Sequence, residues 1–224
     1  MSTVAADRQA RTIFQVDDHA IVRQGLRAVI EKQDDLAVCG CAPAATEALR
    51  RMSELKPDLA VVDISLPGRS GLDLVEDIRG RLPGTKVLVL SIHDEFLYAE
   101  RALRAGASGY VMKRESVETI LEAVETVLDD RVYVSEEVSS HMMRRFLRGE
   151  DSRQSTVEAL SNRELEVFER IGNGMSTREI ADDLCLSVKT IETYRGHIKR
   201  KLELDNATEL LRHAFRWVQD EKSA

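Results

Sequence analysis

Five polar residues stand at or directly after short apolar runs that are far apart along the chain. They are Asp17, Asp18, Asp63, Ser91 and Lys113. Carboxylates that gather at one place repel one another unless a cation joins them, and hard oxygen ligands beside an opening for phosphate suit Mg²⁺. In such a set one carboxylate can act as a nucleophile towards a phosphoryl group. The ammonium group of Lys113 would neutralise that group, and the Ser91 hydroxyl would donate a hydrogen bond to it.

The apolar runs that carry these residues are typical of strands buried on both faces of a parallel sheet, because they are short, nearly continuous and rich in Val, Ile and Leu. They cover residues 12–16, 36–41, 58–64, 86–92 and 108–112. Segments with helical spacing separate them, and their apolar stripes are Ile21, Val22, Leu26, Val29 and Ile30; Leu72, Leu74, Val75 and Ile78; and Val117, Ile120, Leu121, Val124 and Leu128.

This alternation predicts an α/β domain over residues 12–128, with a doubly wound, five-stranded parallel sheet of the flavodoxin-like kind. Ligands of such sheets bind beyond the carboxyl ends of the strands. Since the polar residues named above follow different strands, we expect them to converge at that one edge. A single aspartate at a strand end is more often a helix cap, but the whole set favours a site.

Beyond residue 128 the pattern changes twice. Residues 129–158 are polar, apart from a stretch HMMRRFL that can form one short helix, and we predict an interdomain linker there. Residues 159–224 are helical throughout, which predicts a small all-α domain of four helices. Two Ser-x-x-Glu capping boxes, Ser161 with Glu164 and Ser176 with Glu179, mark helix starts. Ser187 and Asn206 are expected to cap the remaining two helices, and Gly174 suits a left-handed helix end.

A basic stripe lies on the third of these helices, which we expect over residues 188–202. Its cations are Lys189, Arg195, Lys199, Arg200 and Lys201, against one acid, Glu192. The predicted core of the small domain is Ile180, Ala181, Leu184, Ile191, Ile198 and Leu202. The basic residues then face outward from a helix set across a short turn, and such a helix enters the major groove of DNA. The alternative is a merely solvated helix face.

Composition limits the remaining classes. The net charge of -7 argues against a generally basic nucleic-acid binder, so any DNA contact must be local. The three cysteines, Cys39, Cys41 and Cys185, suggest no disulfide framework, which fits a reducing compartment. The N-terminal residues have no apolar core of a signal peptide, and no stretch is long and apolar enough for a membrane span. We therefore expect a cytoplasmic protein without a membrane partner.

The motifs of the first domain resemble the receiver domain of two-component response regulators. They are VDDH at 16–19, the run Asp63-Ile-Ser-Leu-Pro67 with Gly71, Leu90-Ser91, and GASGYVMK at 106–113. The resemblance implies that Asp63 accepts a phosphoryl group from a partner sensor histidine kinase, and that Lys113 contacts the phosphate. It also implies that Ser91 and Tyr110 form a switch pair, although Tyr110 can equally be a plain core aromatic. The implied Mg²⁺ ligands are Asp17, Asp18, Asp63 and the backbone carbonyl of Ser65.

Residues 160–202 resemble the helix-turn-helix of the LuxR type, and the joined chain resembles the NarL/FixJ class of response regulators. The resemblance implies base-facing positions for Glu192, Thr193 and Gly196. The implied phosphate contacts are Lys189, Thr190, Tyr194, Arg195, Lys199 and Arg200. The family often has Lys where Glu192 stands and His where Tyr194 stands. A glutamate is unfavourable near phosphate but can accept a hydrogen bond from cytosine N4, so the preferred base is open.

The resemblance also implies phosphorylation-linked dimerisation. The last helix, expected over about 206–219, either packs onto the small bundle or forms a dimer contact, and its apolar residues are Leu210, Leu211, Ala214, Phe215 and Trp217. We expect no enzyme beyond slow self-dephosphorylation, because an aspartyl-phosphate phosphatase needs a second acid beside the nucleophile and position 65 is a serine. A binding module that works without phosphorylation is the third alternative, which a phosphotransfer assay would separate.

Overall fold

A computed structural model describes residues 10–147 and 156–221. The chain divides into two compact units, Met1–Met143 and Arg144–Ala224. Each unit is described by itself below.

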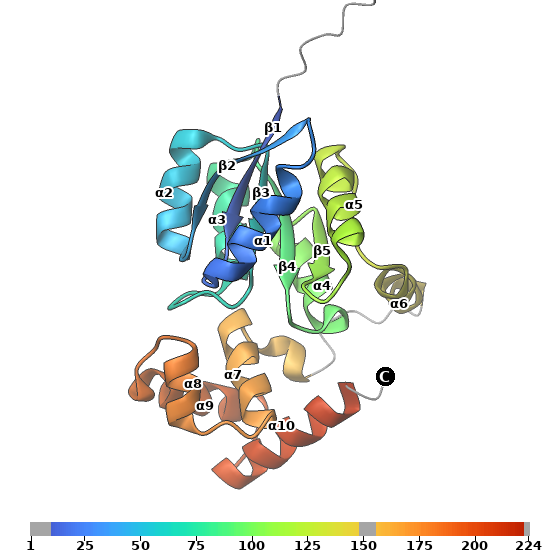
Figure 1. Ribbon diagram of the computed structural model, residues 1–224. Helices are drawn as coiled ribbons and strands as arrows, with labels where there is room; N and C mark the ends of the chain where they lie inside the picture. Colours follow the sequence, from blue (N-terminus) through green and yellow to red (C-terminus); the bar gives the residue numbers. More distant parts are fainter. Residues whose placement is uncertain (1–9, 148–155, 222–224) are drawn as a thin grey trace, which may run out of the picture. The chain divides into compact units, whose positions relative to one another are not determined.

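The first unit contains a five-stranded parallel sheet with the strand order β2-β1-β3-β4-β5 (Figure 1). The strands are β1 Arg11–Val16, β2 Leu36–Ala42, β3 Leu59–Val62, β4 Lys86–Ser91 and β5 Gly109–Met112. All neighbouring pairs are parallel. The doubly wound parallel sheet that the sequence predicts is therefore confirmed.

The register of the three inner strands aligns their carboxyl ends. Val62 of β3 pairs with Val16 of β1 on one side and with Val89 of β4 on the other. Asp17 and Asp63 directly follow the paired valines, so both emerge at the same edge of the sheet. The convergence expected from the sequence thus follows from strand pairing.

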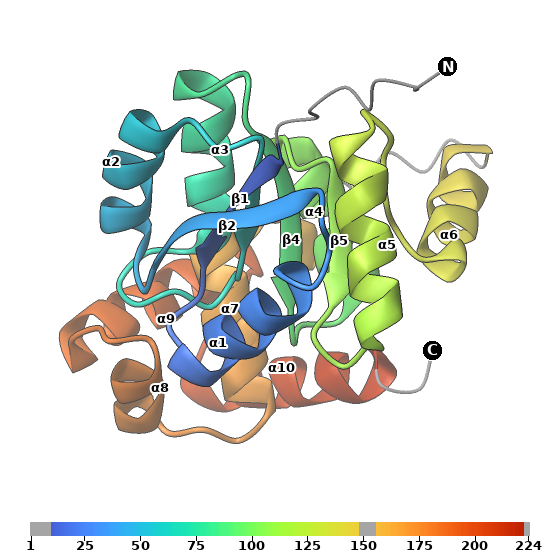
Figure 2. The ribbon, with the colours of Figure 1, turned by 45° about the horizontal axis from the view of Figure 1, so that its top comes forward.

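Helices cover both faces of the sheet (Figure 2). Their bounds are α1 Ala20–Ile30, α2 Ala45–Leu55, α3 Gly71–Arg81, α4 Glu95–Ala105 and α5 Val117–Leu128. On one face, α1 and α5 bury Ile30, Ala123, Val124 and Val127 against strand residues such as Ile13 in one apolar cluster. Burial of apolar surface stabilises this packing by about 25 cal/mol per Å². Helices α2, α3 and α4 lie on the other face of the sheet (Figure 2).

Two residues of the predicted apolar stripes lie outside the core. The side chain of Ile21 is 80% exposed and that of Val117 is 46% exposed. In α1 the inward face is spaced as Val22, Leu26 and Ile30, whereas Ile21 shares its face with the exposed Gly25 and Ala28. The prediction was wrong for Ile21 because a step of one residue turns a helix by about 100°, so adjacent apolar residues do not share one face.

Part of the segment predicted as a linker is built into the first unit. Tyr133 forms an isolated parallel bridge with Gly109 at the edge strand β5. Its carbonyl accepts a hydrogen bond from the Tyr110 N–H at 2.8 Å, and its own N–H donates to the Ser108 carbonyl at 3.1 Å. Helix α6, Glu136–Leu147, follows and includes the stretch HMMRRFL. Residues 148–155 of the predicted linker lie outside the described ranges.

From residue 156 to 221 the second unit consists of the 3₁₀ helix η1 and four α-helices, in agreement with the predicted all-α domain. The bounds are η1 Thr156–Ala159, α7 Asn162–Gly172, α8 Thr177–Asp183, α9 Val188–Lys201 and α10 Ala207–Glu221. Both predicted capping boxes are present, and Ser187 and Asn206 accept hydrogen bonds from the N–H groups of Thr190 and Glu209. Gly174 adopts the expected left-handed conformation, with φ +84°.

The predicted core of the small domain is confirmed, because all six of its residues are buried: Ile180, Ala181, Leu184, Ile191, Ile198 and Leu202. Helices α7 and α10 approach closely at Gly172, where an added Cβ atom would lie 2.5 Å from the Ala214 carbonyl oxygen. Within the two described ranges, no helix is long and apolar enough to cross a membrane.

Candidate functional site

The carboxyl edge of the sheet brings together Asp17, Asp63 and Lys113, as expected from the sequence. The Lys113 Nζ atom lies 2.6 Å from Asp17 Oδ2 and 2.9 Å from Asp63 Oδ2. All three side chains are largely buried, since they are 13%, 8% and 2% exposed for Lys113, Asp17 and Asp63. A buried charge is costly unless it is paired, so the lysine and the two carboxylates stabilise one another.

The backbone around Asp63 depends on a glycine. The Gly71 N–H donates to the Ile64 carbonyl at 2.7 Å, which fixes the loop between β3 and α3. A Cβ atom at position 71 would lie 1.9 Å from the Asp63 carbonyl oxygen. Only a residue without a side chain lets α3 begin so close to the strand end. The Gly71 of the sequence motif thus positions the aspartate.

One oxygen of Asp63 is left for a ligand. Its Oδ1 atom is buried and has no hydrogen-bond partner among the described residues, whereas its Oδ2 atom contacts Lys113. Burial raises the pKa of Asp63, and the charge of Lys113 opposes that rise. For Lys113, burial acts to lower the pKa, but Asp63 and Asp17 together raise it above its ordinary value. An unsatisfied buried oxygen beside a fixed cation is an arrangement that a metal ion or a phosphoryl group can complete.

The acidic group fits a divalent cation. Carboxylate oxygens of Asp17, Asp18 and Asp63 and a ring nitrogen of His19 all lie within 4.8 Å of one another. Oxygen-rich donor sets of this kind are those that Mg²⁺ takes. The Ser65 hydroxyl is hydrogen-bonded to the His93 Nε2 atom at 2.8 Å, while the metal-binding role predicted for the Ser65 carbonyl stays a prediction.

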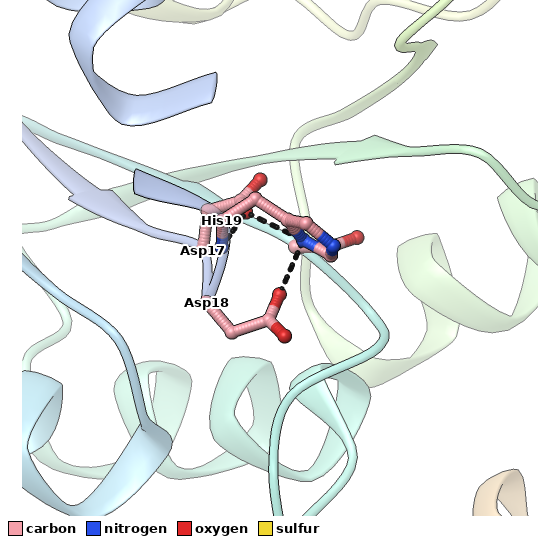
Figure 3. A group of neighbouring side chains, drawn as sticks. Asp17, Asp18 and His19 are labelled. Atoms are coloured by element: carbon pink, nitrogen blue, oxygen red, sulfur yellow. Dashed lines mark hydrogen bonds and ion pairs between the residues drawn. The ribbon is translucent and has the colours of Figure 1, made fainter. Parts of the chain in front are cut away.

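His19 is a member of this group to which the sequence assigned no role. Its Nδ1 atom lies 2.7 Å from Asp18 Oδ1 and 3.4 Å from Asp17 Oδ1 (Figure 3). Its backbone N–H donates to Asp17 Oδ1 at 2.8 Å. The ring therefore turns back towards the two carboxylates instead of pointing away into solvent.

The predicted switch pair lies in the interior. Ser91 is fully buried at the end of β4, and its hydroxyl oxygen accepts a hydrogen bond from the His93 N–H at 3.3 Å. Tyr110 is 1% exposed, and its hydroxyl donates to the His93 carbonyl at 2.7 Å. His93 thus contacts Ser65, Ser91 and Tyr110, a connection that the sequence did not reveal. Tyr110 is both a core aromatic and a hydrogen-bond donor, so the two interpretations of it are compatible.

In the second unit, the outward face of α9 carries the predicted DNA-binding residues. The exposed positions are Lys189, Glu192, Thr193, Gly196 and Arg200. Partly exposed positions are Thr190, Tyr194, Arg195 and Lys199. Ile191 and Ile198 point the other way, into the core. The helix therefore presents a continuous polar and basic surface, although its contacts with DNA stay a prediction.

Lys201 departs from the stripe in which the sequence placed it. Its Nζ atom lies 2.6 Å from Glu164 Oε2, and it also donates to the Ala159 carbonyl at 3.1 Å. Glu164 is buried, which by itself would raise its pKa, but Lys201 and the capping contacts with Ser161 lower the pKa below its ordinary value. Lys201 therefore connects α9 to the start of α7 and is a structural cation of the bundle.

Helix α10 divides its apolar residues between two faces. Leu210 and Ala214 are buried, and the ring of Trp217 lies 5.4 Å from that of Phe168, centroid to centroid. In contrast, Leu211 and Phe215 are 48% and 55% exposed. Packing onto the bundle therefore accounts for one face, and the other face is left for a further contact.

Comparisons with known proteins agree with this arrangement. Residues 13–125 match the response regulator receiver domain, and residues 158–214 match the bacterial regulatory proteins of the luxR family. The oxygen regulatory protein NreC of Staphylococcus carnosus is 35% identical over 209 residues, which cover 91% of this chain and 96% of that protein.

Solved structures are similar as well. A LuxR-family two-component response regulator from Aurantimonas sp. SI85-9A1 is 34% identical, with a TM-score of 0.58, over 62% of this chain and 99% of that chain. RcsB from Salmonella enterica serovar Typhimurium, bound to promoter rprA in the presence of the phosphomimetic BeF3-, has a TM-score of 0.62 over 92% of this chain and 98% of that chain. Its 24% identity supports the fold alone.

Proposed function

The chain belongs to the two-component response regulators that join a receiver domain to a LuxR-type helix-turn-helix, and on this premise we propose that phosphorylation of Asp63 controls DNA binding by α9. It is a transcription regulator that binds DNA. The single observation that supports the assignment of Asp63 is its buried Oδ1 atom, which has no hydrogen-bond partner in the described ranges, beside the cation of Lys113.

In the proposed reaction, a sensor histidine kinase donates the phosphoryl group. Asp63 Oδ1 attacks the phosphorus of a phosphohistidine, the P–N bond breaks, and the imidazole leaves as an acyl phosphate forms. Lys113 stays beside the Asp63 carboxyl group and neutralises the added charge. Asp17, Asp18, Asp63 and the Ser65 carbonyl would hold Mg²⁺, which supplies further charge screening.

The readout proceeds through the switch residues. An aspartyl phosphate adds negative charge and acceptor oxygens, and the Ser91 hydroxyl can donate to one of them once it turns from its present contact with the His93 N–H. The Tyr110 hydroxyl donates a hydrogen bond to the carbonyl of the same His93. A shift of the loop that follows β4, in which His93 lies, would therefore move Tyr110 as well. We propose that this biases a two-state surface and pairs two copies of the chain.

We propose that the protein acts as a regulator and does not turn over a phosphorylated substrate. Ser65 stands where a phosphatase would need its second acid, and its hydroxyl is engaged with His93. This supports a phosphoacceptor with at most slow self-dephosphorylation. A regulator that binds double-stranded DNA works in the compartment that holds the chromosome, which supports the expected cytoplasmic location.

Intact mass after incubation with acetyl phosphate tests the assignment. The native chain should gain one phosphoryl group with Mg²⁺ and little without it, and Asp63→Asn should gain none. Asp58→Asn is the matched control, since Asp58 precedes the same strand at its opposite end, where it bonds Thr12, and it should be phosphorylated normally. If Asp63→Asn gained one phosphoryl group to the same extent as the native chain, the assignment would be wrong.

A further inference from the structure

The ring of His19 lies beside the acidic group at the start of α1. His19 is the N-cap residue of α1, yet its side chain makes no capping hydrogen bond. Instead its Nδ1 atom faces Asp18 and Asp17, at 2.7 Å and 3.4 Å (Figure 3). The side chain is 63% exposed, so solvent ions can reach its ring.

The donor atoms are close enough to surround one ion. Those of Asp17, Asp18, His19 and Asp63 all lie within 4.8 Å of one another. With bonds of about 2.0–2.2 Å to nitrogen and oxygen, opposite ligands of an ion are roughly 4.2 Å apart and adjacent ligands are closer. Small side-chain rotations would therefore bring four donors around one cation.

An independent observation on Asp63 points to a ligand at the same place. Its side chain is 2% exposed, and its Oδ1 atom has no hydrogen-bond partner among the residues described. The charges agree as well, because three carboxylates outnumber the cations of Lys113 and of Arg23, which donates to the Asp17 carbonyl, and the pocket stays negative.

The nitrogen donor distinguishes between classes of metal. Mg²⁺ takes oxygen ligands and gains little from an imidazole, whereas imidazole suits ions such as Ni²⁺ and Zn²⁺. We propose that His19 makes this pocket a mixed nitrogen and oxygen site, in which Co²⁺, Ni²⁺ or Zn²⁺ binds more tightly than Mg²⁺ and displaces it. The inference rests on the proposed function only in naming Mg²⁺ as the ion that is displaced.

Titration of the full-length protein with Co²⁺, followed by visible absorption, tests the proposal. The native chain should bind one Co²⁺ that excess Mg²⁺ displaces competitively. His19→Gln should weaken Co²⁺ binding at least about tenfold, in line with the cost of disturbing metal ligation, and should leave Mg²⁺ affinity within about twofold. The retained Mg²⁺ affinity shows at the same time that the variant pocket is folded.

His197→Gln is the matched control, because His197 is also partly exposed beside a carboxylate, with Nδ1 3.7 Å from Glu164 Oε1. It should leave Co²⁺ binding unchanged. The proposal is overturned if His19→Gln leaves Co²⁺ affinity intact, if it weakens Co²⁺ and Mg²⁺ equally, or if the Co²⁺ signal follows His197. The proposed function is tested separately, by phosphorylation of the native chain with acetyl phosphate and Mg²⁺. If that phosphorylation occurs, the proposed function stands even when His19→Gln leaves Co²⁺ affinity intact. If the native chain is not phosphorylated, the proposed function is refuted.

Discussion

At the scale of single residues, the side chain that follows Ser91 is a candidate for shielding Asp63 from water. Ile92 is 69% exposed, although it is a large branched residue at the end of a buried strand. A single exposed apolar side chain is common on protein surfaces, so its place in the chain, and not its exposure, suggests a role. Because Ile92 directly follows Ser91 at the carboxyl edge of the sheet, we propose that its branched side chain obstructs the approach of attacking water to the aspartyl phosphate.

Replacing Ile92 by alanine should therefore shorten the lifetime of the aspartyl phosphate. We expect hydrolysis about fivefold faster, which corresponds to roughly 1 kcal/mol of activation free energy. The loss of phosphorylated mass with time measures the rate. Leu55→Ala is the control, since Leu55 is an exposed apolar residue at the end of α2, and its lifetime should match that of the native chain. An unchanged lifetime in Ile92→Ala would remove the shielding role.

Residue-level prediction from the sequence succeeded where strand pairing alone decides the outcome. Asp17, Asp63 and Lys113 meet because parallel strands end at one edge of the sheet. Prediction failed for side-chain contacts that depend on the conformation of a loop. The contacts of His93 with Ser65 and Tyr110 depend on how the chain turns after β4. The spacing of residues in the sequence does not predict such contacts.

At the scale of elements, α9 combines an apolar inner face with a basic outer face. Ile191 and Ile198 fix which side faces the core, and this leaves Lys199 and Arg195 at the margin of the exposed surface. The net charge of -7 makes long-range attraction to DNA weak. Close contacts still operate, because the screening length is about 8–10 Å at physiological salt.

The double substitution Lys199→Ala with Arg195→Ala should weaken binding about equally on all duplex sequences. If each monomer engages about three phosphates, the log affinity of a dimer should fall with log salt at a slope near -5. Lys199→Ala alone should flatten that slope by about one unit per monomer. Salt titrations of affinity measure both effects.

Arg212→Ala is the control for this experiment, because Arg212 is an exposed cation on α10, and it should leave the slope unchanged. A double variant with native affinity and native slope would show that the basic face of α9 is merely solvated. Glu192→Gln should instead change which base is preferred, in keeping with its exposed place in the middle of the helix.

Features that depend on neighbouring residues in the sequence were predictable, whereas contacts between different helices were not. The capping boxes of α7 and α8 lie within four residues and were evident in the sequence. The contact between Lys201 and Glu164 joins two helices, so a charge count along α9 could not reveal that this lysine pairs within the bundle. Ile21 was misplaced for a different reason, since a helical stripe of adjacent residues does not specify which one turns outward.

At the scale of the whole molecule, the outer face of α10 is one of the exposed apolar surfaces in the described ranges; α6 carries another, with Phe146 and Leu147. Leu211 and Phe215 stand one helical turn apart and are both about half exposed. Because the two side chains share one face of the helix, we propose that this face makes the dimer contact. A second copy of the chain is the partner that the proposed function requires, because two DNA-binding units read two half-sites about one helical turn apart.

Phosphorylation should therefore convert monomers to dimers at micromolar concentration, as measured by sedimentation with and without a phosphoryl mimic. Phe215→Ser should weaken the dimer, whereas Phe146→Ser, which changes an 80% exposed phenylalanine of α6, should not. An unchanged mass after phosphorylation would argue instead for release of an inhibited DNA-binding unit. Equal effects of the two substitutions would contradict the assignment to α10.

The bridge between Tyr133 and β5 also protects the first unit against aggregation through its edge strand. An edge strand presents unpaired N–H and C=O groups that can template pairing with another chain. Here the segment after α5 occupies part of that edge, since Tyr133 exchanges hydrogen bonds with Ser108 and Tyr110. Chains cut before Tyr133 would expose the backbone edge of β5, whose residues include Tyr110, Val111 and Met112. A receiver fragment should therefore aggregate when it ends at residue 128 and stay dispersed when it extends through α6.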